Sequence, residues 1–148
     1  MKAAFFKGSS SGLGALVDFG IRAWEDGSYS HVELVFSDGR SGSSTSTDGG
    51  VRFTSAGSIN FSDASQWDLL DLEGFDEVAA LAWFDKHAGD KYDLWGDAHF
   101  VVGLIHENKR EEFCSEAVGA ALGFEQAWRF DPNALYYALK RFTTFKAA

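Results

Sequence analysis

The sequence predicts an α+β fold, an antiparallel sheet of about five or six strands with helices packed on it. Residues 30–36 and 67–72 alternate apolar and polar side chains, which is typical of strands. Residues 13–25 instead carry apolar side chains at helical spacing, and Gly27 would end this helix. Because a hairpin turn is expected at 37–40, the strand that follows should return antiparallel to 30–36.

Length and composition indicate a single domain over residues 1–148. Hydrophobic residues make up 45% of the chain, and 14 Phe and 5 Trp are enough for a substantial core. The single Pro and the lack of a long polar tract argue against a disordered linker. One cysteine excludes an internal disulfide, so nothing in the composition requires an oxidising compartment.

Further strands are expected on either side of the predicted hairpin. Residues 3–7 form a short apolar run. The Ser/Thr-rich segment from Ser41 to Thr47 is either an edge strand or a loop, and its place after the turn favours the strand as much as its composition favours the loop. The chain then turns at 48–50 and continues into 51–54.

Further helices are expected in the second half of the chain. Residues 76–84 begin with acidic side chains and carry an apolar side, which predicts a helix that ends near Gly89. One or two helices should lie within 92–105. The last helix should begin with Asp131 as its cap and Pro132 in its first turn.

The formal net charge of −9 disfavours nucleic acid and anionic lipid surfaces as partners. Lys109 and Arg110 could still form a local basic patch. The N-terminal apolar run is too short for a signal peptide or a membrane span. We therefore expect no stable membrane insertion, a location in the cytoplasm or in a phage particle, and a peptide or acyl small molecule as substrate.

Two patterns suggest a cofactor or metal only weakly. The Gly/Ser-rich loop at 8–14 lacks the Gly-Lys-Ser/Thr ending of a phosphate-binding loop, so we interpret it as the entry to a helix. His99 and His106 would share a helix face, but neither belongs to an HExxH pattern or has a neighbouring Cys pair. We expect neither a cofactor nor a metal site.

The only cysteine, Cys114, lies in the stretch on which the functional prediction depends. Residues 114–122 place Cys114 and Val118 on one helix face, and Gly123 supplies a C-terminal stop. A cysteine at a helix start lies near unpaired N–H groups that favour the thiolate, which is the nucleophilic form. The alternative is a small buried apolar residue, as most free cysteines are.

His31 is the histidine best placed to serve that thiol, because it begins the predicted strand 30–36. A thiol at a helix start facing an imidazole on a strand is the arrangement of papain-type hydrolases. Glu33 should project from the same strand face as His31, since side chains alternate with period two. It could orient the imidazole or bind a cation, or it could be a solvated strand carboxylate.

These residues resemble a known superfamily. Ser-His-Val-Glu-Leu-Val at 30–35 and Phe-Cys-Ser-Glu-Ala-Val at 113–118 are similar to the circularly permuted branch of the NlpC-like papain-fold hydrolases, in which the histidine precedes the cysteine. The Tyr-Asp segment at Tyr92 and Asp93 fits the same pattern. The resemblance implies a permuted papain-like architecture and a third polar residue on the strand after the histidine.

Here that strand offers hydroxyls, such as that of Ser44, where a His, Glu, Asp or Asn would be usual. A hydroxyl can fix the imidazole tautomer but stabilises an imidazolium less than a carboxylate does. The third role could therefore fall to Ser44 or to Glu33. Tyr92, Asp93 and Ser115 are candidates for substrate binding or for help at an oxyanion, although Tyr92 could equally be a buried aromatic residue.

The resemblance implies a cysteine-dependent hydrolase of amide bonds, acting on a peptidoglycan-type peptide. Two alternatives remain open at this stage. A lipid acyltransferase or thioesterase of the same fold would use the same Cys-His pair on another acyl group. A catalytically inactive binding or virion-associated module would keep the fold without a reactive thiol.

Overall fold

In the computed structural model, residues 1–7, 28–45, 50–89 and 112–146 are described, and they build one five-stranded antiparallel sheet in the order β4-β3-β2-β1-β5. Three α-helices and a short 3-10 helix, η2, accompany the sheet in these ranges. The strands are β1 (Lys2–Phe6), β2 (His31–Val35), β3 (Ser41–Thr45), β4 (Gly50–Thr54) and β5 (Trp67–Asp71). The helices are α2 (Glu77–His87), α3 (Glu112–Ala121), η2 (Ala127–Arg129) and α4 (Pro132–Lys146).

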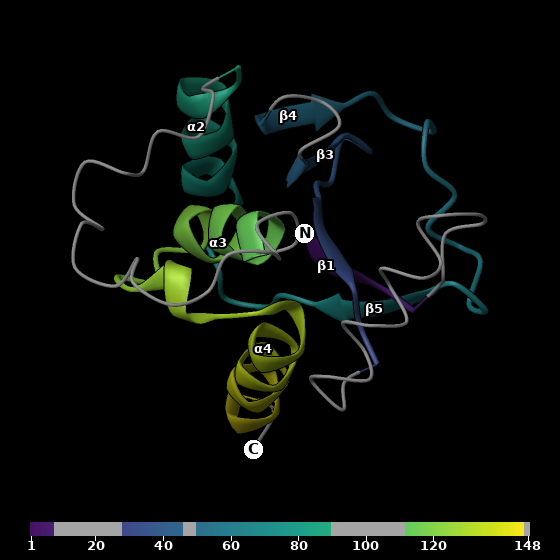
Figure 1. The fold of residues 1–148 in the computed structure, drawn as a ribbon, viewed down its shortest axis with the longest axis vertical. Helices are drawn as coiled ribbons and strands as arrows, with labels where there is room; N and C mark the ends of the chain where they lie inside the picture. The colour runs from purple at the N-terminus through teal and green to yellow at the C-terminus, as the bar shows by residue number, and fades with distance from the viewer. Residues whose placement is uncertain (8–27, 46–49, 90–111, 147–148) are drawn as a thin grey trace, which may run out of the picture.

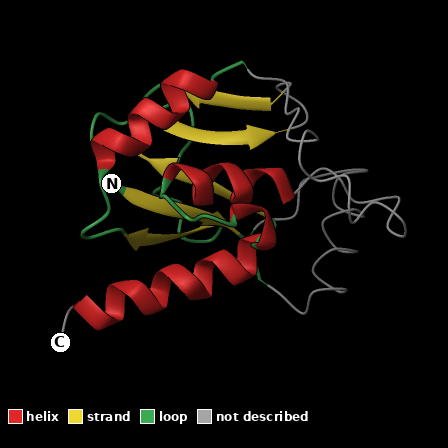
Figure 2. Ribbon diagram, turned by 90° about the vertical axis from the view of Figure 1, so that its left-hand side faces the viewer, coloured by secondary structure: helices red, strands yellow, loops and turns green. Residues whose placement is uncertain are grey.

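The α-helices lie together on one face of the sheet, while the loop from β4 to β5 curves round the other side (Figure 1). Figure 2 shows the same arrangement, with the three helices in front of the strands. The α+β class and the antiparallel sheet predicted from the sequence are thus confirmed. Within the described ranges the sheet has five strands, the lower of the two numbers expected.

The described part of the Ser/Thr-rich segment, Ser41–Thr45, is strand β3, and it is not at the edge of the sheet. β3 pairs with β2 on one side and with β4 on the other, so the edge-strand prediction was wrong and β4 is the edge. The hairpin turn before β3 is confirmed, since Phe36 N donates to Arg40 O at 2.9 Å. Small hydroxyl side chains suit this position because they leave room above the strand for longer neighbours.

The core lies between the sheet and the helices. Ala3 pairs with Leu34 and Phe5 with Val32, so these four residues share the face that the helices cover. Gly42 of β3 lies on that face as well, and a Cβ there would approach the ring of Phe84 to 2.9 Å. The ring of Phe84 in α2 packs directly on β3, which leaves no room for a side chain at position 42.

The predicted helix ends agree with the structure. Asp76 caps α2 by accepting from Ala79 N at 3.0 Å, and Asp131 accepts from Ala134 N at 2.7 Å at the start of α4. Gly123 follows α3 with φ of 85°, and Phe124 N donates back to Gly119 O at 3.0 Å. This αL glycine satisfies the last carbonyls of the cysteine helix.

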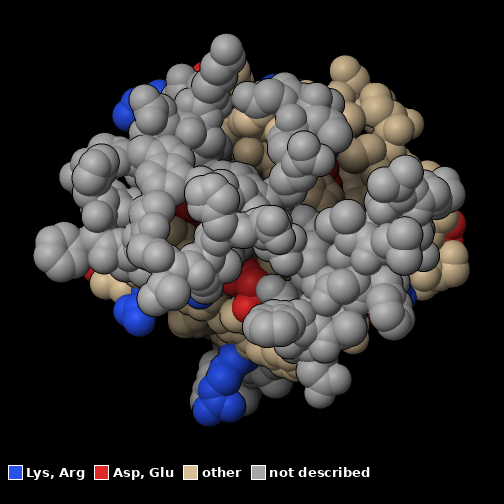
Figure 3. Space-filling view, viewed as in Figure 1, with Lys and Arg blue, Asp and Glu red and all other residues tan. Residues whose placement is uncertain are grey.

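Several predictions fall outside the described residues. They are the loop at 8–14, the helix at 13–25, the helices within 92–105, His99, His106, Lys109 and Arg110. Within the ranges that are described, no helix is long and apolar enough to cross a membrane. On the face seen in Figure 3, the described Lys and Arg side chains stand in separate places near the rim.

Candidate active site

Cys114 lies in the first turn of α3, two residues after the helix begins. The prediction of a helix start at or just before the cysteine is confirmed. α3 packs on β2 and β3, which brings the start of the helix to the sheet. Only 1% of the surface of Cys114 is exposed, and it belongs to the core cluster together with Ala117 and Val118 of its own helix.

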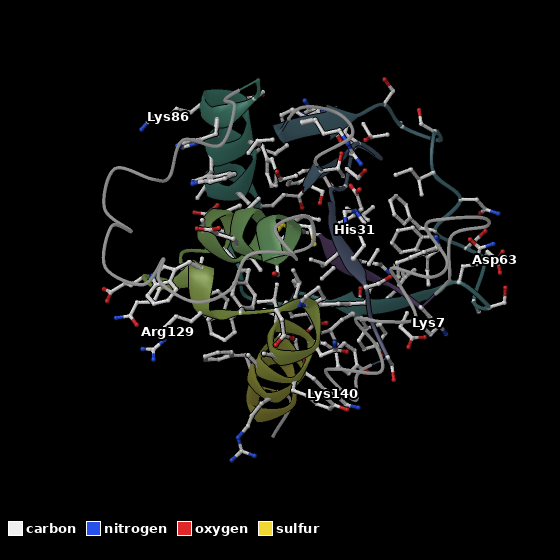
Figure 4. All side chains as sticks on the ribbon, viewed as in Figure 1. Lys7, His31, Asp63, Lys86, Arg129 and Lys140 are labelled. Carbon is white, nitrogen blue, oxygen red and sulfur yellow. The ribbon has the colours of Figure 1, made fainter. Side chains whose placement is uncertain are left out.

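His31 is the first residue of β2 and lies near the centre of the molecule (Figure 4). Its Nε2 is 2.9 Å from Glu33 Oε1, and 23% of its side chain is exposed. Burial disfavours the imidazolium, but an ionised Cys114, a hydrogen bond with that residue and the carboxylate of Glu33 outweigh burial and raise the pKa of His31 to about 10. His31 therefore interacts with the cysteine and with a carboxylate at the same time.

The chain directly before His31 is held in place by α4 and β1. Tyr29 N donates to Asn133 Oδ1 at 2.9 Å, and Asn133 Nδ2 donates to Tyr29 O at 3.1 Å. Ser30 N donates to Phe6 O at 3.0 Å. These bonds fix the entry into β2 and with it the backbone position of the imidazole.

Glu33 is buried, with 1% of its side chain exposed, so the interpretation as a solvated carboxylate was wrong. Its two partners explain how a carboxylate is tolerated there. Besides His31, Arg52 of β4 contacts both of its oxygens, with Nη2 2.8 Å from Oε1 and Nη1 3.3 Å from Oε2. Burial alone would raise the pKa of Glu33, but the bonds from His31 and Arg52 lower it.

The Ser/Thr-rich strand shapes the site without supplying its third member. Within the described parts of β2 and β3, the register covers Leu34 opposite Gly42 and Val35 opposite Ser41, and the ladder stops before His31. Beyond it, Ser43 Oγ donates to Val32 O at 2.7 Å. Ser44 is buried and pairs with the core residue Val51, whereas the group at Nε2 of His31 is the carboxylate of Glu33.

The remaining predicted site residues divide into two groups. Tyr92 and Asp93 lie outside the described residues. Ser115 is fully buried, and its Oγ donates to Phe130 O at 2.5 Å, which ties α3 to the segment after η2. That bond gives Ser115 a packing role, and its proposed part in substrate binding stays a prediction.

Arg52 is the site residue that the sequence analysis did not single out. Its partner Glu33 is 19 residues away in the chain, and β3 lies between their two strands. Only the strand order reveals the contact. The sequence alone shows a cation in the segment after the hydroxyl-rich one, which does not identify its partner.

Among the described residues, no group of three or more His, Cys, Asp or Glu side chains could hold a metal ion. Comparison of the chain with protein-family models, curated proteins and solved structures finds no match. The chemistry of the site thus rests on its own geometry. That geometry places a thiol, an imidazole, a carboxylate and a guanidinium in one connected series.

Proposed function

We propose that the protein is a cysteine-dependent hydrolase of amide bonds in which Cys114 is the nucleophile and His31 its acid-base partner. The observation that carries this proposal is the imidazole of His31, which interacts with the thiol of Cys114 and, through Nε2, with Glu33. A nucleophile, a base and a group that orients the base are the minimum for covalent acyl transfer.

The charge state of the pair supports nucleophilic attack. The pKa of His31, about 10, is raised in part by Cys114 itself, so the two groups act as a coupled pair in which an imidazolium stabilises a neighbouring thiolate. Glu33 Oε1 accepts from Nε2, so Nδ1 is the ring nitrogen left for the sulfur. Cys114 also lies in the first turn of α3, at the positive end of the helix dipole, which favours negative charge.

The reaction then proceeds in two steps. The sulfur of Cys114 forms a bond to the carbonyl carbon, and the carbonyl oxygen becomes an oxyanion held by N–H groups at the helix start. When this intermediate collapses, the carbon–nitrogen bond breaks and His31 donates its proton to the leaving amine. Water, which loses a proton to His31, attacks the thioester and releases a carboxylic acid and the thiolate.

One observation favours a second candidate function. Only 1% of the surface of Cys114 is exposed, and the residue belongs to the core cluster. A binding or particle-associated module, with Cys114 as a core residue and no turnover, would fit that burial. The two candidates differ in the reactivity of the thiol and in turnover, both of which can be measured.

The proposal is tested by turnover and by trapping the acyl-enzyme. Wild type, Cys114→Ala and His31→Ala are incubated with murein peptide amides and, separately, with short-chain acyl thioesters, and intact protein masses are recorded. Wild type should release amine from the peptides and gain an acyl mass that Cys114→Ala does not gain. Turnover of the thioesters alone would assign the site to the acyltransferase or thioesterase class. Folded wild type with no turnover above Cys114→Ala on either substrate would leave the binding module.

A further inference from the structure

We propose that Arg52 is a positioning residue of this site, which keeps the buried carboxylate of Glu33 ionised and fixed at Nε2 of His31. The inference rests on the proposed function and extends it by a fourth residue. In this assignment Arg52 acts through Glu33, with which it shares two hydrogen bonds.

The contact geometry carries the proposal. Glu33 Oε1 is shared, since it lies 2.8 Å from Arg52 Nη2 and 2.9 Å from His31 Nε2. The second oxygen, Oε2, lies 3.3 Å from Arg52 Nη1. A guanidinium that touches both oxygens fixes the plane of the carboxylate, which a single hydrogen bond would not do. Arg52 and His31 are thus linked through the shared oxygen Oε1.

The strand between them lets this contact form. Arg52 of β4 pairs with Ser43 of β3, and β3 separates it from Glu33 on β2. Two strand spacings amount to roughly 10 Å, which an extended arginine and the glutamate side chain span together. Ser43 is fully buried and turns its hydroxyl to Val32 O, so the arginine passes over a small side chain. Thr54 accepts a further hydrogen bond from Arg52 Nη1 and steadies the arginine on its own strand.

The charges that meet around Glu33 determine what the loss of Arg52 would do. The charged groups that meet here are Arg52 from β4, His31 and Glu33 from β2, and Cys114 from α3. When all four are ionised, their charges cancel. Without Arg52 the buried group would be left with a net negative charge, and proton uptake by Cys114 or Glu33 is the least costly correction. Loss of Arg52 should therefore lower the fraction of reactive thiolate.

Two surface ion pairs do not involve the imidazole of His31. Arg40 pairs with Asp38, and Lys2 with Asp71, on exposed surface. Neither carboxylate contacts His31 in the described structure, whose imidazole meets Glu33. Arg129 is exposed and bonds Gln126 at 2.8 Å, away from the site (Figure 4). Arg129→Gln therefore removes the same charge as Arg52→Gln and serves as the matched control.

The experiment measures the rate of iodoacetamide alkylation of Cys114 against pH. Arg52→Gln should lose at least about tenfold in rate near pH 7, because a neighbouring charge changes such equilibria by about one pH unit or more. Arg52→Lys, which restores the charge but not the contact to both carboxylate oxygens, should recover only part of that loss. Arg129→Gln should follow wild type. An Arg52→Gln profile equal to that of wild type would overturn the proposal.

A double-mutant cycle separates positioning from mere stability. If Arg52 acts through Glu33, then Arg52→Gln should change the rate less than about twofold when Glu33→Gln is already present. A tenfold further loss in that background would overturn the proposal. The cycle also keeps the test decisive if Arg52→Gln alone fails to fold, because the double variant buries no unpaired charge.

A carboxyl titration distinguishes failure of this inference from failure of the proposed function. The ¹³C signal of the Glu33 carboxyl reports its protonation whether or not Cys114 is reactive. Protonation of Glu33 should begin at a higher pH in Arg52→Gln than in wild type. An unchanged Glu33 titration contradicts the role of Arg52 even if the thiol is reactive. An inert thiol with a shifted Glu33 titration contradicts only the hydrolase.

Discussion

Replacement of Glu33 by glutamine tests the energetics of the site most sharply. Glutamine keeps the shape of the side chain but removes its charge, which leaves Arg52 and protonated His31 without their shared anion. Loss of one partner of a buried ion pair costs about 3–5 kcal/mol. Here 21% of the Arg52 side chain and 23% of the His31 side chain are exposed, so water compensates part of that cost. We expect Glu33→Gln to lower the free energy of unfolding by about 2–4 kcal/mol.

The assay is urea unfolding at pH 7. With a slope of about 2 kcal/mol per molar urea, the loss corresponds to a midpoint lower by roughly 1–2 M. Asp71→Asn is the control, because its pair with Lys2 is 3.2 Å long and both side chains are about half or more exposed, at 48% and 67%. That control should stay within about 0.5 kcal/mol of wild type.

The pH dependence of the same variant has a defined sign. The folded protein lowers the pKa of Glu33 below its usual value of 4.5. The stabilisation by Glu33 is therefore fully present above pH 4.5 and is lost as the pH falls through the folded-state pKa. The stability difference between wild type and Glu33→Gln should shrink in acid. A difference below about 0.5 kcal/mol at pH 7, or one that does not change in acid, would refute the reasoning.

Two further predictions concern the core and the imidazole. Gly42→Ala would place a Cβ 2.9 Å from the Phe84 ring, so it should lower the free energy of unfolding by about 1–3 kcal/mol. An unchanged midpoint in urea unfolding would contradict the packing of α2 on β3. His31 should titrate by NMR with a pKa of about 10, and Cys114→Ser should lower that value because the thiolate is removed. An identical titration in both proteins would show that the thiol and the imidazole do not interact.

Local patterns predicted most of the elements because each depends on residues close in the chain. Alternation indicated β2 and β5, the turn after Phe36 indicated the hairpin, and Asp131 marked the start of α4. Strand order is a different kind of property. The sequence gives no local sign that β4 pairs outside β3, and the edge-strand prediction failed for that reason.

The candidate site likewise combines contacts that follow from local spacing with contacts that depend on tertiary packing. A spacing of two residues was enough to put His31 and Glu33 on one face, and their contact at 2.9 Å confirms it. Burial of Glu33 depends on tertiary packing, so its charge environment could not be foreseen from the strand alone. Arg52 reaches Glu33 across β3, and such a contact follows only from the assembled sheet.

The proposed hydrolase requires that Cys114 and His31 form a reactive pair. Its most direct test is the rate of iodoacetamide alkylation of Cys114 against pH in wild type and in His31→Ala. We expect a rate in wild type that is already high at about pH 6, and a profile in His31→Ala displaced toward that of an ordinary thiol of pKa about 8.5. An inert thiol in wild type, or the same ordinary profile in both proteins, would contradict it and make Cys114 a core residue.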